Sequence, residues 1–250
     1  MNVIGVIPAR WASTRFPGKS LAPLCGKPLI QWVAERCRQA RRLDDVLVAT
    51  DDDRIRRVVS ALGIRAVMTR GDHPSGTDRV AEAVRGLNAD VVVNIQGDEP
   101  LIDPALIDRL VEVMLAERRW DMATAAVALD VDVANPSVCK VVFGRDDQAL
   151  YFSRCPIPFI RDPEFRADQP VHWRHIGIYL YRAVFLEKLV AEPPCLLERA
   201  ECLEQLRALY LGGRIKVLRT DQAGIGVDTP ADVAQVEAMM KQKGMVGRDG

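Results

Sequence analysis

The first half of the chain alternates short apolar runs with segments in which apolar residues recur every three or four positions. Such runs are typical of buried strands, and the recurring spacing is typical of helices. The run 90–95, DVVVNI, is almost entirely β-branched, which predicts a central strand buried on both faces. Repeated strand–helix units with short connections predict a parallel sheet with helices on both faces. The predicted strands are 3–8, 45–50, 65–69 and 90–95, and the predicted helices are 29–40, 55–62, 77–87 and one that begins at Asp103-Pro104.

The pattern changes after Asp121, where strand-like pieces follow one another closely. We interpret 122–181 as an antiparallel extension of a single α/β domain that covers 1–240, followed by a polar tail at 241–250 that frays. A capping box at Thr229 opens the last helix. The remaining predictions are strands at 122–128, 138–143, 148–153, 175–181 and 215–219, a proline-broken stretch at 156–170, and a helix at 197–211 that ends at Gly212-Gly213.

Composition excludes several classes of protein. Lys and Arg together number 34, and so do Asp and Glu, so no bulk positive charge is present to favour sequence-independent binding of nucleic acid. No run of apolar residues is long enough to cross a membrane, and the N-terminus lacks the features of a signal peptide. The six cysteines form no C-x-x-C pair, which makes a structural zinc site unfavourable. We therefore expect reduced thiols in a cytoplasmic protein.

The loop after the first predicted strand carries three cations, Arg10, Arg15 and Lys19. In open α/β sheets, ligands bind beyond the carboxyl ends of the strands, so these cations are placed to neutralise a triphosphate. A solvated surface loop is the alternative interpretation. Two better-known phosphate loops are absent: Ser13 stands where a Walker A loop needs its first glycine, and Gly224-x-Gly226 lacks the third glycine of a dinucleotide fingerprint. These absences disfavour a P-loop hydrolase and a nicotinamide dehydrogenase.

Two acidic residues, Asp98 and Asp228, each come after a predicted strand. Asp98 comes just after the buried strand 90–95, and Asp228 precedes the last predicted helix. Mg²⁺ typically takes one or two carboxylates together with substrate phosphates. If the two carboxylates converge near the cationic loop, they complete a metal–triphosphate site; otherwise each is a turn or cap residue.

Further polar groups stand in less decisive settings. The segment from Asp72 to Arg79 offers short polar side chains and a helix N-terminus, which favours anions. A capped loop explains the same residues equally well. The segment 174–179 and the pair Glu204-Gln205 place polar groups among apolar neighbours, a pattern that is more often structural than functional.

Taken together, these motifs resemble the 3-deoxy-manno-octulosonate cytidylyltransferases, also called CMP-Kdo synthetases. The resemblance runs from Val3 to about Val236, with the motifs in the family's order. Trp11 and Phe16 replace the usual Tyr and Leu, which preserves bulk and leaves the cation spacing unchanged. The motifs that carry the resemblance are IPARWASTRFPGK, ATDDD, GDHPSGTDR, VNIQGDEP, ALYFSR, HIGIYLYR, LEQLR and GVDTP.

The resemblance implies a nucleotidyltransferase-type, Rossmann-like fold and a cytoplasmic homodimer that makes CMP-Kdo and pyrophosphate from CTP and Kdo with Mg²⁺, for lipopolysaccharide synthesis. It implies catalytic roles for Arg15, Lys19 and Asp98, and metal ligation by Asp98 and Asp228. The nucleotide site then consists of Arg10, Arg15, Lys19, Ser75 and Asp98, and the sugar-acid pocket of Arg79, Gln96, Arg154, His175, Tyr179 and Glu204. Dimerisation through 122–181 is a further expectation.

Two other functions remain open from the sequence. One is activation of a related sugar acid such as 8-amino-Kdo, which needs only a few changes in the pocket. The other is a non-catalytic regulator that binds CTP without releasing pyrophosphate. The presence of both acidic residues and all three cations argues against the regulator.

Overall fold

The computed structural model describes residues 1–12, 16–162, 164–222 and 224–245. Its contacts divide the chain into two compact units. Unit 1 comprises Met1–Arg109 and Gly224–Gly250, and unit 2 comprises Leu110–Ala223. The expected bounds of one domain over 1–240 with an extension at 122–181 stay a prediction.

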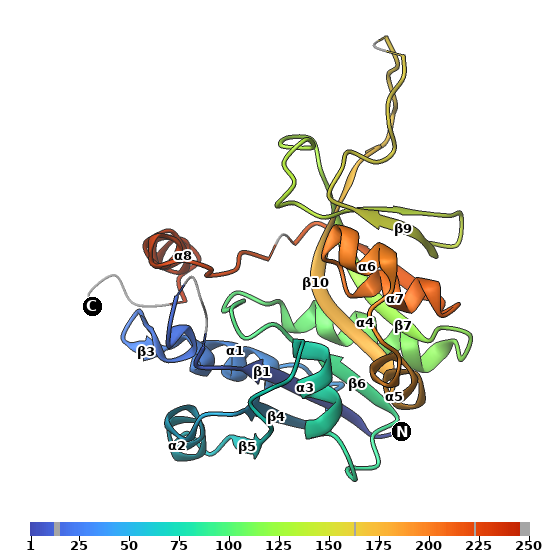
Figure 1. The fold of residues 1–250 in the computed structure, drawn as a ribbon. Coiled ribbons are helices and arrows are strands. Elements are labelled where there is room, and N and C mark those ends of the chain that lie inside the picture. Colours follow the sequence, from blue (N-terminus) through green and yellow to red (C-terminus); the bar gives the residue numbers. More distant parts are fainter. Residues whose placement is uncertain (13–15, 163, 223, 246–250) are drawn as a thin grey trace. The chain divides into compact units, whose positions relative to one another are not determined.

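Unit 1 is built on a parallel sheet whose strand order is β6-β1-β4-β5. Every residue of β6 is buried, and so are nearly all residues of β1 and β4, which places side chains from both faces of the sheet in the core. Helices α1, α2 and α3 pack against these strands (Figure 1). The strands of this sheet are β1 (Val3–Ala9), β4 (Asp45–Thr50), β5 (Arg65–Met68) and β6 (Val91–Asn94). The helices of unit 1 are α1 (Leu29–Cys37), α2 (Asp53–Ala61), α3 (Gly76–Ala83) and α8 (Pro230–Gln242). Its shorter elements are the 3₁₀ helix η1 (Lys19–Leu21) and the antiparallel pair β2 (Pro23–Leu24) and β3 (Lys27–Pro28).

The segment after residue 224 returns to unit 1 and completes part of its core. Val227, Val236 and Met240 pack with Trp32 and other buried residues near α1. The backbone N–H of Val227 also donates to the carbonyl of Asp98, at 2.8 Å. Residues more than a hundred positions apart in the sequence therefore meet in one hydrophobic cluster.

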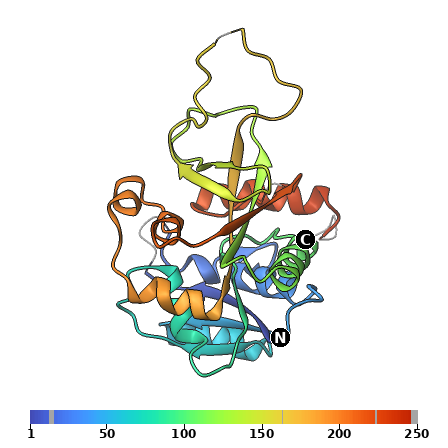
Figure 2. The same cartoon turned by 90° about the vertical axis from the view of Figure 1, so that its right-hand side faces the viewer.

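Unit 2 combines parallel and antiparallel strands. β7 pairs with β11 in parallel and with β10 antiparallel, while β8 pairs antiparallel with β9 and β10. Between β9 and β10 the chain forms a long loop, seen in yellow in Figure 2, in the proline-broken stretch predicted at 156–170. The strands of unit 2 are β7 (Met122–Ala128), β8 (Lys140–Phe143), β9 (Ala149–Ser153), β10 (Trp173–Arg182) and β11 (Ile215–Thr220). Its helices are α5 (Ala183–Ala191), α6 (Leu196–Glu201) and α7 (Gln205–Tyr210). Helix α4 (Pro104–Ala116) begins in the residues of unit 1 and ends in those of unit 2.

The predicted fold class is confirmed: the protein is α/β, with a mostly parallel sheet flanked by helices and with antiparallel strands added after residue 121. The predicted helix 197–211 is wrong, because the chain breaks at Cys202 into α6 and α7. Cys202 has φ +52°, a left-handed conformation that ends α6. The predicted helix at 77–87 is too long, since α3 ends at Ala83 and Gly86 (φ +78°) follows in a turn.

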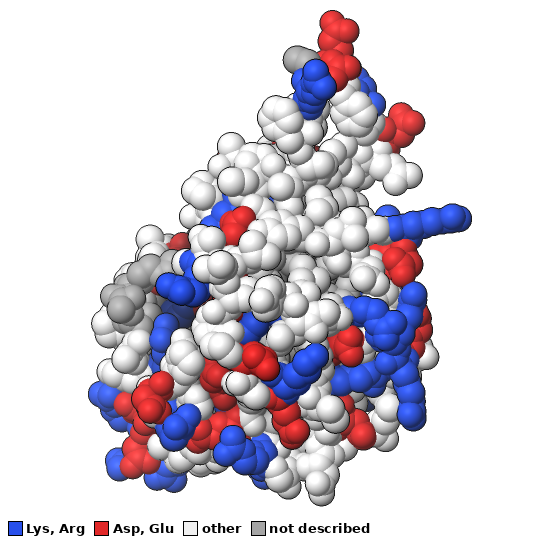
Figure 3. Space-filling view, turned by 45° about the vertical axis from the view of Figure 1, so that its right-hand side comes forward, with Lys and Arg blue, Asp and Glu red and all other residues white. Residues whose placement is uncertain are grey.

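The distribution of charged side chains and the state of the cysteines can be compared with the sequence predictions. On the face drawn in Figure 3, Lys and Arg side chains lie among Asp and Glu side chains. All six cysteines are free, so none of them forms a disulfide. Among the residues that the structure describes, no helix is long and apolar enough to cross a membrane.

Candidate active site

The loop that follows β6 passes close to the carboxyl end of the neighbouring parallel strand β1. A Cβ atom on Gly97 would lie 2.8 Å from the carbonyl oxygen of Pro8, so the loop after β6 can pass this close to β1 only because residue 97 is glycine. Close passage brings Asp98 to the end of β1. The position agrees with the general rule that ligands of open α/β sheets bind beyond the strands' carboxyl ends.

Lys19 joins the two acidic residues predicted from the sequence. Its Nζ atom lies 2.6 Å from Oδ2 of Asp98 and 3.3 Å from Oδ1 of Asp228. The three residues come from η1, from the loop after β6 and from the loop before α8, and all three belong to unit 1. The convergence of Asp98 and Asp228, on which the sequence hypothesis depended, is therefore present.

Asp228 is held in place by the N-terminus of α8. One carboxylate oxygen of Asp232 accepts hydrogen bonds from the backbone N–H groups of Asp228 (2.9 Å) and Thr229 (2.7 Å). These backbone hydrogen bonds lower the pKa of Asp232 from its ordinary value. The predicted capping box at Thr229 is confirmed. Its function here extends beyond the helix, because it fixes the loop that carries Asp228.

The cationic loop is described only at its two ends. Arg10 is exposed, and Arg15 lies outside the described residues. Gly18 adopts φ +70°, and a Cβ atom there would lie 2.9 Å from the ring of Trp11. The Gly18 N–H donates to the carbonyl of Trp11 at 3.1 Å, which closes the loop just before Lys19.

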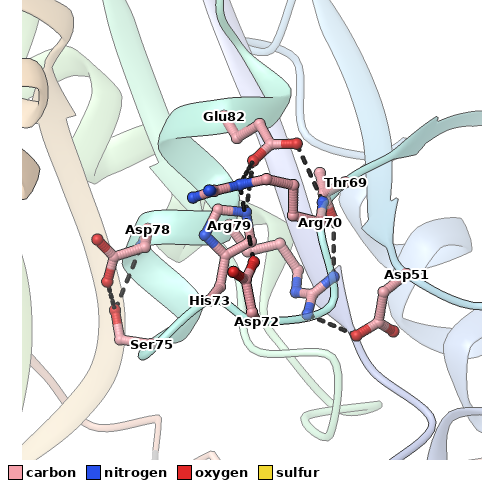
Figure 4. A network of polar contacts seen from close by, with 9 residues as sticks. All are labelled: Asp51, Thr69, Arg70, Asp72, His73, Ser75, Asp78, Arg79 and Glu82. Carbon is pink, nitrogen blue, oxygen red and sulfur yellow. Dashed lines mark hydrogen bonds and ion pairs between the residues drawn. The ribbon is translucent and has the colours of Figure 1, made fainter.

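Residues of the segment 69–82, together with Asp51 after β4, form the polar network of Figure 4. Ser75 is the N-cap of α3: its hydroxyl accepts from the Asp78 N–H at 3.2 Å and donates to the Asp78 carboxylate at 2.6 Å. Arg79 is buried and donates to Thr69 Oγ1 at 2.6 Å and to Asp51 Oδ2 at 2.8 Å. These contacts give Arg79 a structural function inside unit 1. Asp51 follows β4 at the carboxyl edge of the sheet, and the same edge rule that singled out Asp98 was a signal for it.

The other predicted sugar-pocket residues divide between the units. Gln96 is partly exposed in unit 1, and the remaining four belong to unit 2. Arg154 donates to the backbone carbonyls of Glu201 (2.6 Å) and Pro136 (2.9 Å), so it too has structural partners. His175 and Tyr179 lie on β10 with their ring centroids 5.3 Å apart, and Glu204 is the N-cap residue of α7.

Comparison with known proteins places this chain in a family. The family model for cytidylyltransferases matches residues 4–216. A relative from Bdellovibrio bacteriovorus, named 3-deoxy-manno-octulosonate cytidylyltransferase, is 47% identical over 98% of this chain and 100% of its own length. A relative of the same name from Syntrophobacter fumaroxidans is 49% identical, over 97% of this chain and 98% of its own. The chain belongs to the 3-deoxy-manno-octulosonate cytidylyltransferase family.

One solved structure agrees with this assignment, and a more distant one shows the same fold. A CMP:2-keto-3-deoxy-manno-octonic acid synthetase complexed with CTP superposes with a TM-score of 0.93, at 42% identity, and covers 97% of this chain and 100% of its own. A 4-diphosphocytidyl-2C-methyl-D-erythritol synthase from Anaerococcus prevotii, at 12% identity and a TM-score of 0.64, shares the fold. The family resemblance read from the sequence motifs is thus confirmed.

Proposed function

We propose that this protein transfers the CMP group of CTP to 3-deoxy-manno-octulosonate (Kdo), with release of pyrophosphate. The observation that carries the proposal is the position of Lys19 between Asp98 and Asp228 at the carboxyl edge of the unit 1 sheet. In the reaction, a bond forms between the anomeric oxygen of the sugar and the α-phosphorus. The bond from that phosphorus to the bridging oxygen of pyrophosphate breaks, and the proton of the anomeric hydroxyl passes to solvent.

Lys19 is suited to bind the triphosphate. An ammonium group has three N–H donors, and contacts to Asp98 and Asp228 occupy two of them. No other contact of this ammonium is found among the described residues, so the third donor is available to a phosphate oxygen. The two carboxylates also hold the ammonium in one position, and a preorganised charge stabilises a transition state without reorganising during the reaction. Arg10 and Arg15 supply further positive charge from the same loop in this proposal.

Asp98 and Asp228 fit a magnesium ion that the nucleotide carries. Two carboxylates and one ammonium give this cluster a formal surplus of one negative charge, which by itself repels a triphosphate. Their oxygen atoms are the ligands that Mg²⁺ prefers, and Mg²⁺ is usually held by one or two carboxylates together with substrate phosphates. In this proposal, phosphate oxygens and water complete the coordination of the ion. When bound, Mg²⁺ polarises the α-phosphate and lowers the pKa of a coordinated hydroxyl.

The other predicted ligands divide by substrate. We assign Ser75 to the nucleotide, and Gln96, His175, Tyr179 and Glu204 to the sugar acid. Arg79 and Arg154 stay predicted members of the sugar pocket, although their contacts in the structure are to the protein itself. No step of this reaction needs a nucleophile on the protein, because the sugar hydroxyl attacks directly. Catalysis then consists of positioning and charge stabilisation.

We further propose that the protein acts as a homodimer in the cytoplasm and supplies lipopolysaccharide synthesis. The segment expected to carry the dimer contact, 122–181, includes the long loop between β9 and β10, on which Phe159 and Phe165 are exposed. Free thiols support a reducing compartment. Sedimentation of the purified protein tests the dimer, and a single monomeric species contradicts it.

A pyrophosphate-release assay tests the proposed reaction. Purified protein is incubated with CTP, Kdo and Mg²⁺, and each component is then omitted in turn. We expect release only when all three are present. Side-by-side rates with Kdo and 8-amino-Kdo determine the sugar acid. Binding of CTP without any release of pyrophosphate would instead identify a regulator and overturn the proposal.

A further inference from the structure

Thr124 stands opposite an irregularity in the pairing of β7 with β10. Ala125 pairs with Ile176 and Ala123 pairs with Leu180, so the single residue Thr124 faces three residues of β10. Bulges of this kind interrupt the hydrogen-bond ladder and re-aim side chains, and they are common next to active sites. The side chain of Thr124 replaces part of the missing ladder: its hydroxyl oxygen lies 2.8 Å from the carbonyl oxygen of Ile178 and 3.1 Å from that of Ile176.

The same hydroxyl contacts the imidazole of His175. Oγ1 of Thr124 lies 2.9 Å from Nε2 of His175. A hydroxyl has one proton, and the two carbonyl oxygens can only accept, so the proton of Thr124 is directed to the carbonyls. The oxygen is then left as an acceptor toward His175. The contact is therefore a hydrogen bond only when Nε2 carries a proton.

The imidazole of His175 is neutral, so it carries a single proton. If that proton is on Nε2, the other ring nitrogen, Nδ1, carries no proton. The ring is desolvated by Phe152, Tyr179 and their neighbours, and this burial lowers the pKa of His175 to about 3. A neutral imidazole protonated at Nε2 has a bare Nδ1, which is an acceptor. No described residue hydrogen-bonds to Nδ1, and that atom is not one of the buried polar atoms that lack a partner. The residue itself keeps some exposed surface.

We propose that Thr124 is a positioning residue that holds His175 in the Nε2–H tautomer, so that Nδ1 accepts a hydrogen bond from a hydroxyl group of the sugar acid. The proposal rests on the proposed function in one respect: it takes His175 as a member of the sugar-acid pocket. Thr124 itself does not touch the substrate. It acts through the orientation and the proton position of the imidazole.

The tautomer can be observed in the wild-type protein without any substrate. The chain has three histidines, so the imidazole signals in long-range ¹H–¹⁵N spectra are few, and the spectrum of His175→Gln assigns those of His175. We expect His175 to be protonated at Nε2 throughout the neutral pH range. Protonation at Nδ1 would overturn the proposal, whether or not the protein turns over Kdo.

Kinetics of two matched variants test the consequence for the substrate. Thr124→Ser keeps the hydroxyl, and Thr124→Val keeps the shape and removes it. We expect the KM for Kdo to stay close to that of the wild type in Thr124→Ser and to rise about tenfold in Thr124→Val, as for the loss of one hydrogen bond, with the KM for CTP unchanged in both.

Equal effects of the two substitutions, or a parallel rise of both KM values, would overturn the proposal, because a general disturbance of unit 2 has no reason to spare CTP or to be rescued by serine. If Thr124→Val does not fold, the wild-type spectrum still tests the tautomer of His175, and the Thr124→Ser kinetics still test whether a hydroxyl at this position preserves the KM for Kdo. A wild-type protein that releases no pyrophosphate with Kdo would contradict the proposed function, and the spectrum would then report on the tautomer alone.

Discussion

Replacing Asp98 by Asn removes one negative charge from the cluster and leaves the side-chain size almost unchanged. Oδ2 of Asp98 lies 2.6 Å from Nζ of Lys19, and the Asp98 side chain is 28% exposed. The loss of one preorganised group at a reacting centre costs about 2.7–4 kcal/mol, so we expect kcat to fall about 10²–10³-fold in Asp98→Asn. The fold should be retained, because the hydrogen bond from Val227 to this loop uses the backbone carbonyl of Asp98.

Asp228→Asn provides an internal comparison. Its carboxylate lies 3.3 Å from the same ammonium nitrogen and is 48% exposed, so solvent screens it more. Loss of one charged hydrogen bond costs about 1.5–3 kcal/mol. The expected fall in kcat is therefore about 10–150-fold and smaller than for Asp98→Asn.

The assay is the initial rate of pyrophosphate release at saturating CTP and Kdo, repeated over a series of Mg²⁺ concentrations. Asp53→Asn is the matched control, because it removes a carboxylate charge from an exposed ion pair on α2. Thermal unfolding of each variant establishes that the protein is folded. A rate close to that of the wild type in Asp98→Asn, or a larger loss in Asp228→Asn, would refute the reasoning.

Lys19→Met should mainly raise the KM for CTP, and steady-state kinetics with an unchanged CTP dependence would contradict its assignment to the triphosphate. Glu198 and Arg207 form a buried ion pair with two hydrogen bonds of 2.8 Å, and Glu198→Gln removes the negative charge of this pair. Denaturant titrations should show a free energy of unfolding that is lower by about 3–5 kcal/mol. A loss no larger than that for an exposed ion pair would contradict this prediction. The pKa of His175 is lowered to about 3 in the folded protein, so below its ordinary value of 6.5 the unfolded chain binds a proton that the folded chain does not. Stability should therefore fall from about pH 6.5 toward pH 3, and denaturant midpoints should show a weaker dependence in His175→Gln; an identical pH dependence in the variant would count against this burial.

Most strands and helices could be predicted from the local spacing of apolar residues, whereas the break in the predicted helix 197–211 depends on contacts with residues distant in the sequence. The apolar run 45–50 coincides with β4, because a buried strand needs little more than a short apolar sequence between turns. The break at Cys202 has no such signal, since the apolar spacing continues through 197–211. Its cause lies in β9 and the residue after it: the Glu201 carboxylate accepts from Ser153 Oγ and the Arg154 N–H, and the Arg154 side chain takes the carbonyls of Glu201 and Cys202. These contacts hold the chain at Cys202, whose left-handed φ of +52° ends α6.

The candidate site shows the same division. The position of Asp98 after a buried strand and of Asp228 before a helix could be inferred from the sequence, which left their convergence as a condition. The structure meets that condition, because Lys19 contacts both carboxylates. The partner of Arg79 could not be predicted, since which of several acidic residues in ATDDD reaches a buried guanidinium depends on side-chain packing; the structure selects Asp51. The same is true of Thr124, whose importance depends on a pairing irregularity in β10 that nothing in the sequence HIGIYLYR announces.

Unit 1 is assembled from two separated stretches of chain, and this has a consequence for biosynthesis. During translation the sheet β6-β1-β4-β5 emerges early, yet Val227, Val236 and Met240 of its hydrophobic cluster are added more than a hundred codons later. A nascent polypeptide therefore exposes the apolar surface around Trp32 until ribosomes have read past residue 240, and it lacks the second carboxylate for nearly as long. Premature termination after residue 223 would leave a product that can neither cover this surface nor complete the acidic pair around Lys19.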